Sequence, residues 1–360
     1  MKQHHIVTRR TFLRGSIIGG MGAMLPLSAA HPQSRRPRVR IAWSIYTGWM
    51  PWEFAAARGI LKKWSDRCNV DLVLMDQAQY GPTIEAYSAE QADACVMTNM
   101  DCMIAPAATG RASTVLIMGD YSNGNDAIIL PKGMASIKGE KLTLIGGTVS
   151  QYLYSRFLTM TGMAEADVPL EFVLEESDIP LVFVGGKPVA TWNPHVMSIM
   201  KMPGSTKIFD SSKIPGEIQD LLVVSTPLLE QYPDAGKALV GAWYEVMAIM
   251  STRGEEERRA IAHMAAQSPC SATEFREQLK TTMLYTTSQA AAAYLDSAEL
   301  RKVTGQVFDF CWDAGLFKDA KTRDFMGIRF PDGSVLGNPK RVFMTFDSKF
   351  TEMHARGEIK

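Results

Sequence analysis

The sequence predicts an α/β fold built on parallel, doubly wound sheets. β-rich segments alternate with helical segments from Arg38 to Pro131, and the alternation restarts at Lys141. A mainly helical region follows from about Pro227. Alternation of this kind is typical of parallel strands covered by helices on both faces. We therefore expect two α/β units followed by helices.

In the first unit, five β-rich runs alternate with helical runs. Strands are predicted at residues 38–45, 70–76, 92–99, 113–121 and 126–131. Helices are predicted at 51–67 and 80–90 and from 101 onward. Pro51 suits the first turn of its helix, because a proline there removes no helical hydrogen bond. Pro106 is expected to interrupt the third helix.

The second unit and the C-terminal region continue the pattern. Strands are predicted at 141–147, 170–176, 188–194 and 206–210, and a helix at 149–162 with Ser150 as its N-cap. Farther on, helices are predicted at 236–251, 271–283 and 297–317. Ser271 and Glu274 have the spacing of a capping box. The last helix buries one face, predicted from the apolar residues Leu300, Val303, Val307, Phe310 and Cys311.

The first thirty residues have the pattern of an export signal. Paired arginines, Arg9 and Arg10, precede an apolar run of about 12 residues, which is too short to span a bilayer. Small residues end at Ala30. We predict a twin-arginine signal, residues 1–30, cleaved near Ala30; the alternative is a basic, unstructured N-terminus. The remaining chain, about 330 residues, suggests two domains of roughly 150.

Composition narrows the class of protein. Lys plus Arg and Asp plus Glu both number 38, which argues against nucleic acid as the main partner. Five widely spaced cysteines form neither a disulfide framework nor a zinc pattern. No later apolar run approaches the ~18 residues of a membrane-spanning helix, so we expect a soluble mature protein without metal or cofactor.

Candidate ligand-binding residues follow the predicted strands, since ligands of open α/β sheets bind beyond the carboxyl ends of the strands. Those loops are aromatic, amide-rich and acidic, and they contain no Lys or Arg. The candidates are Trp43, Ser44, Tyr46 and Trp49, then Thr98, Asn99 and Asp101, then Asn123, Asn125 and Asp126, and in the second unit Ser150, Trp192 and Asn193.

The charge of these loops indicates the chemistry of the ligand. An anion would require Arg, Lys or free helix N-termini. Carboxylates accept hydrogen bonds from N–H groups, and tryptophan faces attract cations. The loops therefore favour a small ligand rich in N–H donors, either neutral or cationic.

Each candidate also has a purely structural explanation. The tryptophans of "AWSIYTGWMPW" could be core, Asp101 and Asp126 could cap helices, and "NGND" could be a simple turn. His195 is more typical of a solvated loop. No nucleophile elbow, HExxH, P-loop or dinucleotide-binding motif is present. We therefore predict that the protein is not an enzyme.

Several segments resemble one protein family. These are "AWSIYTGWMPW", "GILKKW", "TNMD", "GDYSNGNDAI", "TWNP", "IFDSSKIPGEIQDLLVV" and "GKALVGAWYEVMA". The chain resembles the type II periplasmic substrate-binding proteins of ABC transporters, the group with sulfonate, nitrate, taurine and thiamine-precursor binders. It is most similar to the branch associated with urea carboxylase and with urea or guanidine transport. The resemblance is weakest at 176–189 and near the C-terminus.

The resemblance implies two α/β lobes joined by two crossovers, with the ligand in the cleft. Residues 38–128 and 218–360 would form the first lobe, and residues 129–217 the second. The hinge would close over the ligand and present a shape to an inner-membrane ABC permease. A periplasmic monomer is expected.

The resemblance also assigns roles at the cleft. Trp43, Tyr46 and Trp49 would form an aromatic wall, while Trp52 packs on the inner face of its helix. Asp101 and Asp126 would accept N–H groups from urea or guanidinium. Further contacts would come from Ser44, Thr98, Asn99, Asn123, Asn125, Ser150 and Asn193, with Trp192 closing from the second lobe and Glu217 as a reserve carboxylate.

Other readings stay open. The same fold could bind an aliphatic sulfonate, nitrate or another small anion, or serve as a solute sensor. It could also be a thiamine-pyrimidine synthase, although those enzymes carry a cysteine-rich loop that is missing here. The segment "ESDIPLVF" departs from the family, because Pro180 stands where a helix is expected. That helix is predicted to start late, with Asp178 as its cap.

Overall fold

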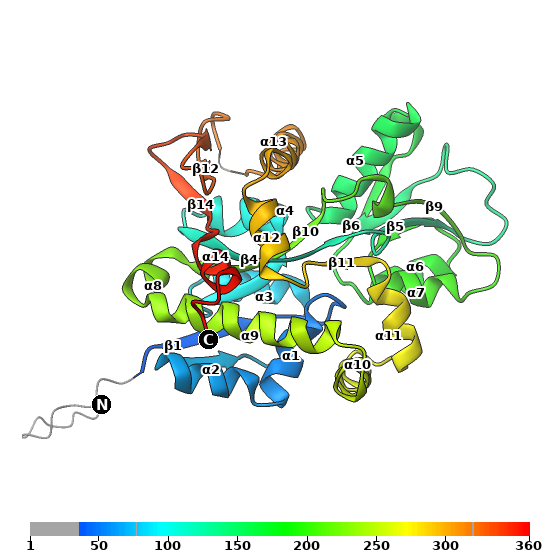
Figure 1. Ribbon diagram of the computed structural model, residues 1–360. Helices are drawn as coiled ribbons and strands as arrows, with labels where there is room; N and C mark the ends of the chain where they lie inside the picture. Colours follow the sequence, from blue (N-terminus) through cyan, green and yellow to red (C-terminus); the bar gives the residue numbers. More distant parts are fainter. Residues whose placement is uncertain (1–35, 77, 319) are drawn as a thin grey trace, which may run out of the picture. The chain divides into compact units, whose positions relative to one another are not determined.

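Alternating strands and helices fill the part of the chain that the computed structural model describes, residues 36–76, 78–318 and 320–360. The predicted signal at 1–30 lies outside these residues. Residues Arg36–Lys360 form one unit with two sheets. Figure 1 shows their elements in chain order.

The larger sheet has nine strands. Its order is β13-β12-β14-β4-β10-β3-β1-β2, and β11 pairs with β4. The strands are β1 (Arg38–Ala42), β2 (Asp71–Leu74), β3 (Ala94–Thr98), β4 (Ser113–Ser122), β10 (Gln219–Ser225), β11 (Thr282–Leu284), β12 (Gly327–Arg329), β13 (Val335–Gly337) and β14 (Val342–Phe346). β1 runs parallel to β2 and β3, whereas β10 runs antiparallel to both of its neighbours.

The smaller sheet has five strands in the order β7-β6-β8-β5-β9. These are β5 (Ala127–Leu130), β6 (Leu142–Ile145), β7 (Leu170–Val173), β8 (Val189–Thr191) and β9 (Thr206–Asp210). β6 is parallel to β7 and β8, and β5 is antiparallel to β8 and β9. Both sheets are therefore mixed. The expectation of purely parallel sheets was wrong at β5 and β10, because strand direction depends on the connection and not on local sequence.

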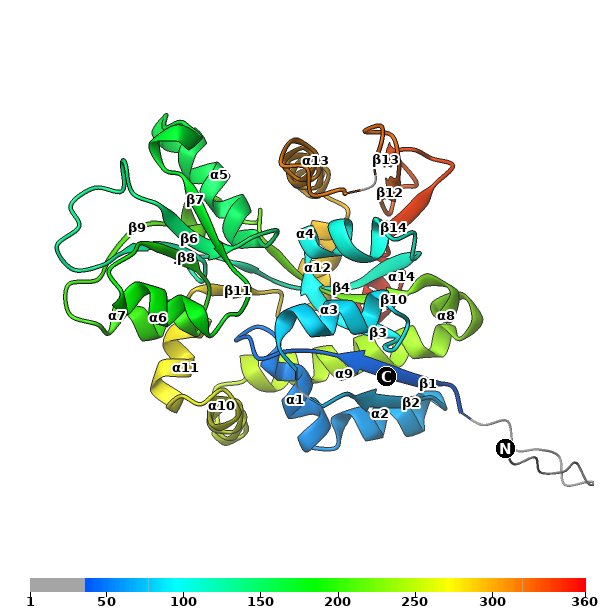
Figure 2. The same ribbon diagram turned by 180° about the vertical axis from the view of Figure 1, so that it is seen from behind.

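Helices cover both faces of each sheet. They are α1 (Met50–Ala57), α2 (Ile60–Cys68), α3 (Tyr80–Ser88), α4 (Asn99–Cys102), α5 (Val149–Thr161), α6 (Asp178–Val184), α7 (His195–Met200), α8 (Thr226–Gln231), α9 (Pro233–Ser251), α10 (Glu255–Gln267), α11 (Ala272–Leu279), α12 (Ser288–Leu295), α13 (Ala298–Asp313) and α14 (Lys349–Ala355). A π-helical turn, Met103–Ala107, continues α4, and short 3-10 turns lie at Glu165–Asp167 and Ser211–Lys213. Figures 1 and 2 show α9 on one face of the larger sheet and α3 on the other.

Successive residues of β5 are buried on opposite faces of the smaller sheet, which explains why this sheet has a helix layer on each side. Ala127 and Ile129 of β5 pack with residues of α6 and α7, whereas Ile128 packs into the main core. Successive side chains of a strand point to opposite faces, so an unbroken apolar strand needs cover on both. The α/β, doubly wound class of the prediction is thereby confirmed.

The chain passes between the sheets twice. β4 ends at Ser122 and β5 begins at Ala127; β9 ends at Asp210 and β10 begins at Gln219. The crossover segments are thus 123–126 and 211–218. The exact lobe boundaries, 38–128 with 218–360 and 129–217, stay a prediction.

Two local predictions were confirmed, the packing of Trp52 and the capping box at Ser271. Trp52 is buried and its ring stacks on Trp243 of α9 at 5.2 Å. Ser271 and Glu274 form the predicted capping box. All five cysteines are free, and three of them are buried. Among the residues that the structure describes, no helix is long and apolar enough to cross a membrane.

Four local predictions need correction. Thr148, not Ser150, caps α5, because its hydroxyl accepts the Ser150 N–H at 3.3 Å. Helical structure continues through Pro106 as a π-helical turn. Asp178 is the first residue of α6 and makes no capping hydrogen bond. On α13, Phe308 is fully buried and the predicted Phe310 is only half-buried.

Candidate functional site

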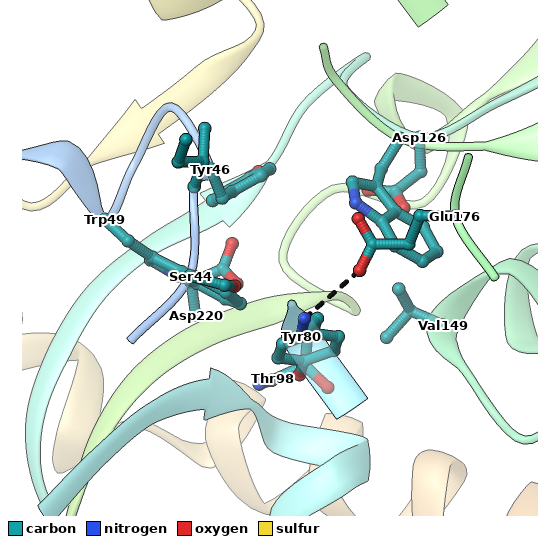
Figure 3. A pocket seen from close by; sticks show the side chains of 11 residues that line it. Ser44, Tyr46, Trp49, Tyr80, Thr98, Asp126, Val149, Glu176 and Asp220 are labelled. Atoms are coloured by element: carbon teal, nitrogen blue, oxygen red, sulfur yellow. Dashed lines mark hydrogen bonds between the residues drawn. The ribbon is translucent and has the colours of Figure 1, made fainter. Parts of the chain in front are cut away.

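A small cavity lies where the carboxyl ends of strands from both sheets meet. It offers about 30 Å³ to the centre of a water molecule. A single water needs roughly 10–15 Å³ by the same measure, so the cavity suits a ligand of a few heavy atoms. Figure 3 shows this candidate cavity, whose lining is Ser44, Ile45, Tyr46, Trp49, Tyr80, Thr98, Asp126, Val149, Glu176, Trp192 and Asp220.

Four aromatic rings form a continuous series around the candidate cavity. The ring centroids of Tyr46 and Trp49 are 5.0 Å apart, those of Trp49 and Tyr80 5.1 Å, and those of Tyr80 and Trp192 6.4 Å. The rings are tilted or edge-on to one another, so none is covered by a parallel partner. We call these four residues the ring cluster. Their faces suit a planar or cationic group.

A tight turn between β1 and α1 brings two of these rings to the cavity. The backbone N–H groups of Trp49 and Met50 both donate to the Tyr46 carbonyl, at 2.9 and 3.1 Å. Gly48 lies inside the turn, and a Cβ there would be only 2.2 Å from an Asp120 carboxylate oxygen. A glycine is therefore needed for the turn to approach Asp120.

Three buried aspartates gather beside the rings. Asp120 of β4 and Asp220 of β10 are direct cross-strand partners, and Asp126 is the last residue of the crossover into β5. Their exposed fractions are 0%, 3% and 2%. Asp126 and Asp220 line the candidate cavity, and Asp120 lies behind them against Gly48. We call these three residues the carboxylate cluster.

The carboxylate cluster lacks a compensating cation among the described residues that line the cavity. Burial raises the pKa of Asp120 and of Asp126 to about 7. Burial, followed by the charges of Asp120 and Asp126, raises the pKa of Asp220 well above its usual range. Desolvation and a nearby like charge both disfavour the ionised form. A bound cation would reverse both effects.

Several oxygens of this cluster have no hydrogen-bond donor. In the part of the chain that the structure describes, both oxygens of Asp120, Oδ1 of Asp126 and Oδ2 of Asp220 lack a donor when the groups are ionised. The indole N–H of Trp49 is also unpartnered. Because the pKa values of Asp120 and Asp220 are both raised, a proton shared between the two carboxyl groups would relieve part of this deficit. Buried polar groups without partners are rare in proteins and point to a ligand or another unseen partner.

Asn125 ties the cavity to the crossover. Its amide N–H₂ donates to the Tyr46 hydroxyl and to Thr282 Oγ1, each at 2.7 Å. Its carbonyl oxygen accepts from Asn193 at 2.6 Å and from Thr281 at 2.7 Å. Asn125 and Asn193 therefore lie beside the site but use their amides to support it.

Asp101 also lies behind the cavity wall. Its carboxylate accepts hydrogen bonds from the hydroxyls of Tyr80 and Thr98, each at 2.5 Å. Burial raises the pKa of Asp101 to about 6. The helix it was thought to cap is capped by Thr98 instead. Asp101 therefore holds Tyr80 and Thr98 in place and does not face the cavity.

The structure brings six of the fourteen predicted binding residues to the cavity lining: Ser44, Tyr46, Trp49, Thr98, Asp126 and Trp192. Their contact with a ligand stays a prediction. The other eight do not line it: Trp43, Asn99, Asp101, Asn123, Asn125, Ser150, Asn193 and Glu217.

Four more of these eight residues lie in other surroundings. The Trp43 indole donates to the Met75 carbonyl at 2.9 Å, which removes it from the predicted aromatic wall. The Asn99 amide donates to the Glu217 carbonyl at 3.0 Å. The Glu217 carboxylate is held by Arg156 and Tyr152, so it is no reserve acceptor. The Ser150 hydroxyl is buried without a partner among the described residues.

Asn123, the last of the eight, is half-buried, and its backbone N–H donates to the Thr281 carbonyl at 2.8 Å. His195 was expected to be solvated; its side chain is 20% exposed, with Nε2 3.9 Å from a Glu176 carboxylate oxygen. The loop composition suggested that these side chains were free to bind a ligand. In the structure they make contacts within the protein instead.

Sequence reasoning missed Ile45, Tyr80, Val149, Glu176 and Asp220. Tyr80 opens the helix after the second strand, a strand end that the search for candidates passed over. Asp220 is an acidic residue inside the apolar run "QDLLVV". Because carboxylates are seldom buried, an acidic residue in a buried strand could have identified Asp220 as a candidate site residue. Glu176 lies in the segment that departs from the resembled family, so neither pattern nor resemblance identified it.

The described residues contain no group of three or more His, Cys, Asp or Glu side chains arranged to hold a metal ion. What the site offers is four ring faces and three carboxylates in a space for a few heavy atoms. Such a site can bind a small, planar hydrogen-bond donor.

Comparisons with known proteins identify the fold. No protein-family model matches the sequence, and no curated protein sequence matches it significantly. Among solved structures, the aliphatic sulphonate binding protein SsuA of Escherichia coli is similar, with a TM-score of 0.63 and 16% identity over 78% of this chain and 88% of that one. The alkanesulfonate-binding protein SsuA of Xanthomonas axonopodis pv. citri, bound to MOPS, has a TM-score of 0.65 and 13% identity over 80% and 96%.

A third similar structure is the periplasmic nitrate-binding protein NrtA of Synechocystis PCC 6803. It has a TM-score of 0.54 and 13% identity over 90% of this chain and 99% of that one. At these identities the likeness concerns the fold and not the ligand. The chain has the α/β fold of periplasmic binding proteins.

Proposed function

We propose that this protein is the solute-binding component of an ABC importer and that it captures a small cation rich in N–H donors, guanidinium or a derivative of it. In this proposal it works in the periplasm after twin-arginine export, as a monomer that delivers its ligand to a membrane permease. The periplasmic-binding-protein fold supports the role, and the candidate cavity supports the ligand.

The observation that carries the proposal is the carboxylate cluster without a cation. Asp120, Asp126 and Asp220 are nearly fully buried, and four of their oxygens lack donors within the described residues. An isolated buried carboxylate is strongly disfavoured unless it is paired. A cationic ligand supplies the missing charge and the missing N–H groups together.

Guanidinium fits this environment on three counts. It is planar, with N–H pairs whose spacing matches a carboxylate in two parallel hydrogen bonds. Its flat face can stack on Trp49 or Trp192 of the ring cluster. Its four heavy atoms suit a cavity of about 30 Å³. Urea has the same shape but no charge, so we expect it to bind more weakly at neutral pH.

The alternative of a small anion is disfavoured by charge. Asp126 and Asp220 line the candidate cavity, and no Lys or Arg lines it in the described part of the chain. A sulfonate or nitrate would face like charges without a compensating donor of positive charge.

Closure over the ligand belongs to the same proposal. Trp192 and Glu176 come from the smaller sheet, while Tyr80 comes from a helix on the larger sheet. A hinge at the two crossover segments would separate these groups and let the ligand enter.

The proposal is tested by calorimetric titration of the purified protein with guanidinium, urea and taurine in parallel at pH 8. We expect guanidinium to bind at least tenfold more tightly than urea, and taurine not to bind. In Asp220→Asn, guanidinium affinity should fall by at least about 100-fold, since breaking a buried ion pair costs about 3–5 kcal/mol.

Asp347→Asn is the matched control, because Asp347 is partly buried but lies outside the candidate cavity. Its guanidinium affinity should equal that of the unmodified protein. Tight taurine binding, or guanidinium affinity equal in Asp220→Asn and the unmodified protein, would overturn the proposal.

A further inference from the structure

A second, larger cavity adjoins the candidate cavity. It offers about 360 Å³ to the centre of a water molecule. Ile45 and Glu176 line both spaces, so these two side chains form the partition between them. The other lining residues of this adjoining cavity are Pro194, His195, Met197, Ser198, Lys201, Ser268, Pro269, Cys270, Glu274 and Gln278.

The partition is held by only a few contacts. An oxygen of the Glu176 carboxylate accepts the backbone N–H of Tyr80 at 3.3 Å, which is long for a hydrogen bond (Figure 3). The other oxygen lies 3.9 Å from His195 Nε2. Glu176 belongs to the turn between β7 and α6, and 25% of its side chain is exposed. A side chain held in this way can move aside for a ligand atom.

The lining of the adjoining cavity includes both apolar and charged residues. Ile45, Pro194 and Met197 give it apolar lining. Lys201 and Glu274 also line it and form an ion pair with each other. Lys201 is therefore already neutralised and offers little free positive charge to a ligand.

We propose that the physiological ligand is an N-monosubstituted guanidinium whose head occupies the candidate cavity and whose tail passes between Ile45 and Glu176 into the adjoining cavity. This inference rests on the proposed function and deepens it by naming the ligand class. The head cavity has room for the guanidinium alone, whereas the adjoining space is about ten times larger. A short alkyl tail would bury apolar surface against Ile45 and Met197.

The charge of the partition selects among tails. A tail that ends in a carboxylate must pass the Glu176 carboxylate, which repels it. A neutral alkyl tail or a tail that ends in an amine meets no such repulsion. The ligand class is therefore alkyl or aminoalkyl guanidines, and guanidino acids are excluded.

The test compares guanidinium with propylguanidinium by calorimetric titration. In the unmodified protein, propylguanidinium should bind at least as tightly as guanidinium. Ser198→Trp fills the adjoining cavity from an exposed position on α7 that does not line the candidate cavity. This variant should weaken propylguanidinium at least tenfold while guanidinium affinity changes less than twofold; Met197→Trp should do the same.

Thr159→Trp is the control for an added indole, since Thr159 is exposed on α5 and lines a different cavity. It should affect neither ligand. Guanidinium binding with propylguanidinium more than tenfold weaker in the unmodified protein would overturn the tail site and leave the proposed function intact. The tail site also fails if Ser198→Trp and Met197→Trp leave propylguanidinium unaffected. Absence of guanidinium binding would overturn both.

A second pair of probes tests the charge of the tail. 4-Guanidinobutylamine should bind at least tenfold more tightly than 4-guanidinobutanoate, and Glu176→Gln should reduce that ratio. A ratio near one in the unmodified protein, or a ratio unchanged in Glu176→Gln, would contradict the role of Glu176 in selecting the tail.

Discussion

At the scale of single residues, the site is built from groups that are unfavourable in the empty protein. Asp120 and Asp220 face each other across β4 and β10, and Gly48 leaves room for the Asp120 carboxylate. Like charges directly opposite in a sheet destabilise it. Binding sites commonly retain such groups because the ligand, rather than the fold, satisfies them.

The ligand-free protein should therefore lose stability as the pH rises from about 4 to above 7. An unfolded aspartate ionises near about 3.9, whereas folded Asp120 and Asp126 have pKa values of about 7. Between these values the folded state binds more protons than the unfolded state, so the free energy of unfolding falls with pH. Below about 4 both states are protonated and the penalty is absent. Thermal unfolding at pH 5 and pH 8 measures the difference.

The variant Asp220→Asn tests the cause of this pH dependence. An amide at this position can donate to Asp120, so the variant should be more stable than the unmodified protein at pH 8 by at least about 1.4 kcal/mol, the equivalent of one pKa unit. Its stability should also change less between pH 5 and pH 8. Glu85→Gln, at an exposed position on α3, is the control and should behave like the unmodified protein. An unchanged pH dependence in Asp220→Asn would contradict the assignment.

At the scale of elements, the helices obey local rules that a sequence displays directly. α13 begins after Ser297, whose hydroxyl accepts the Leu300 N–H at 3.1 Å. Its apolar residues at Leu300, Val303 and Val307 are buried at the spacing of one helix face. This helix therefore owes its start to one side chain and its position to an apolar stripe.

Removal of this cap should weaken the fold without altering the site. Ser297→Ala should lower the free energy of unfolding by about 1 kcal/mol, because an N–H of the first turn loses its acceptor. Ser297→Asn keeps an acceptor and should stay within a few tenths of a kcal/mol of the unmodified protein. Urea unfolding measures both. Equal stabilities for the alanine and asparagine variants would show that the cap contributes nothing.

At the scale of the whole unit, the two sheets meet through a network of hydrogen bonds around Asn125. This one amide contacts Tyr46 in the ring cluster, Thr282 at β11 and Asn193 after β8. It thus joins the cavity to both sheets. The network is also a place where ligand contact and the relative placement of the sheets can influence each other.

Asn125→Ala should therefore destabilise the protein and weaken ligand binding together. It removes the hydrogen bonds that Asn125 makes with the buried Asn193 amide and Tyr46 hydroxyl, and a buried polar group that loses its partner costs about 1–3 kcal/mol. Guanidinium affinity should fall as well, since the Tyr46 ring loses its anchor. Asn123→Ala is the control, because within the described residues the hydrogen bond of Asn123 is made by its backbone N–H. The network would lack this role if Asn125→Ala matched the control in both urea unfolding and calorimetric titration.

The sequence alone predicted the fold class and several local features. Its alternation predicted the α/β class, and the capping box at Ser271 and Glu274 was read correctly from spacing. The loop after β1 was predicted to supply Tyr46 and Trp49 to the ligand site; both line the cavity, and their contact with a ligand stays a prediction. These features are local, because a turn, a cap or a strand end depends on residues a few positions apart.

The tertiary structure decided which carboxylates face the cavity. Asp101 looked like a ligand contact and instead supports Tyr80, while Asp220 pairs with Asp120 one hundred positions away in the sequence. β10 enters the larger sheet antiparallel, only after the chain has built the smaller sheet. Strand partner and direction follow from that long return, which no local pattern encodes. Because β10 is antiparallel, Asp220 at its amino end lies beside Thr98 at the carboxyl end of β3, so the side chains that meet at this edge are set by the packing of the whole unit.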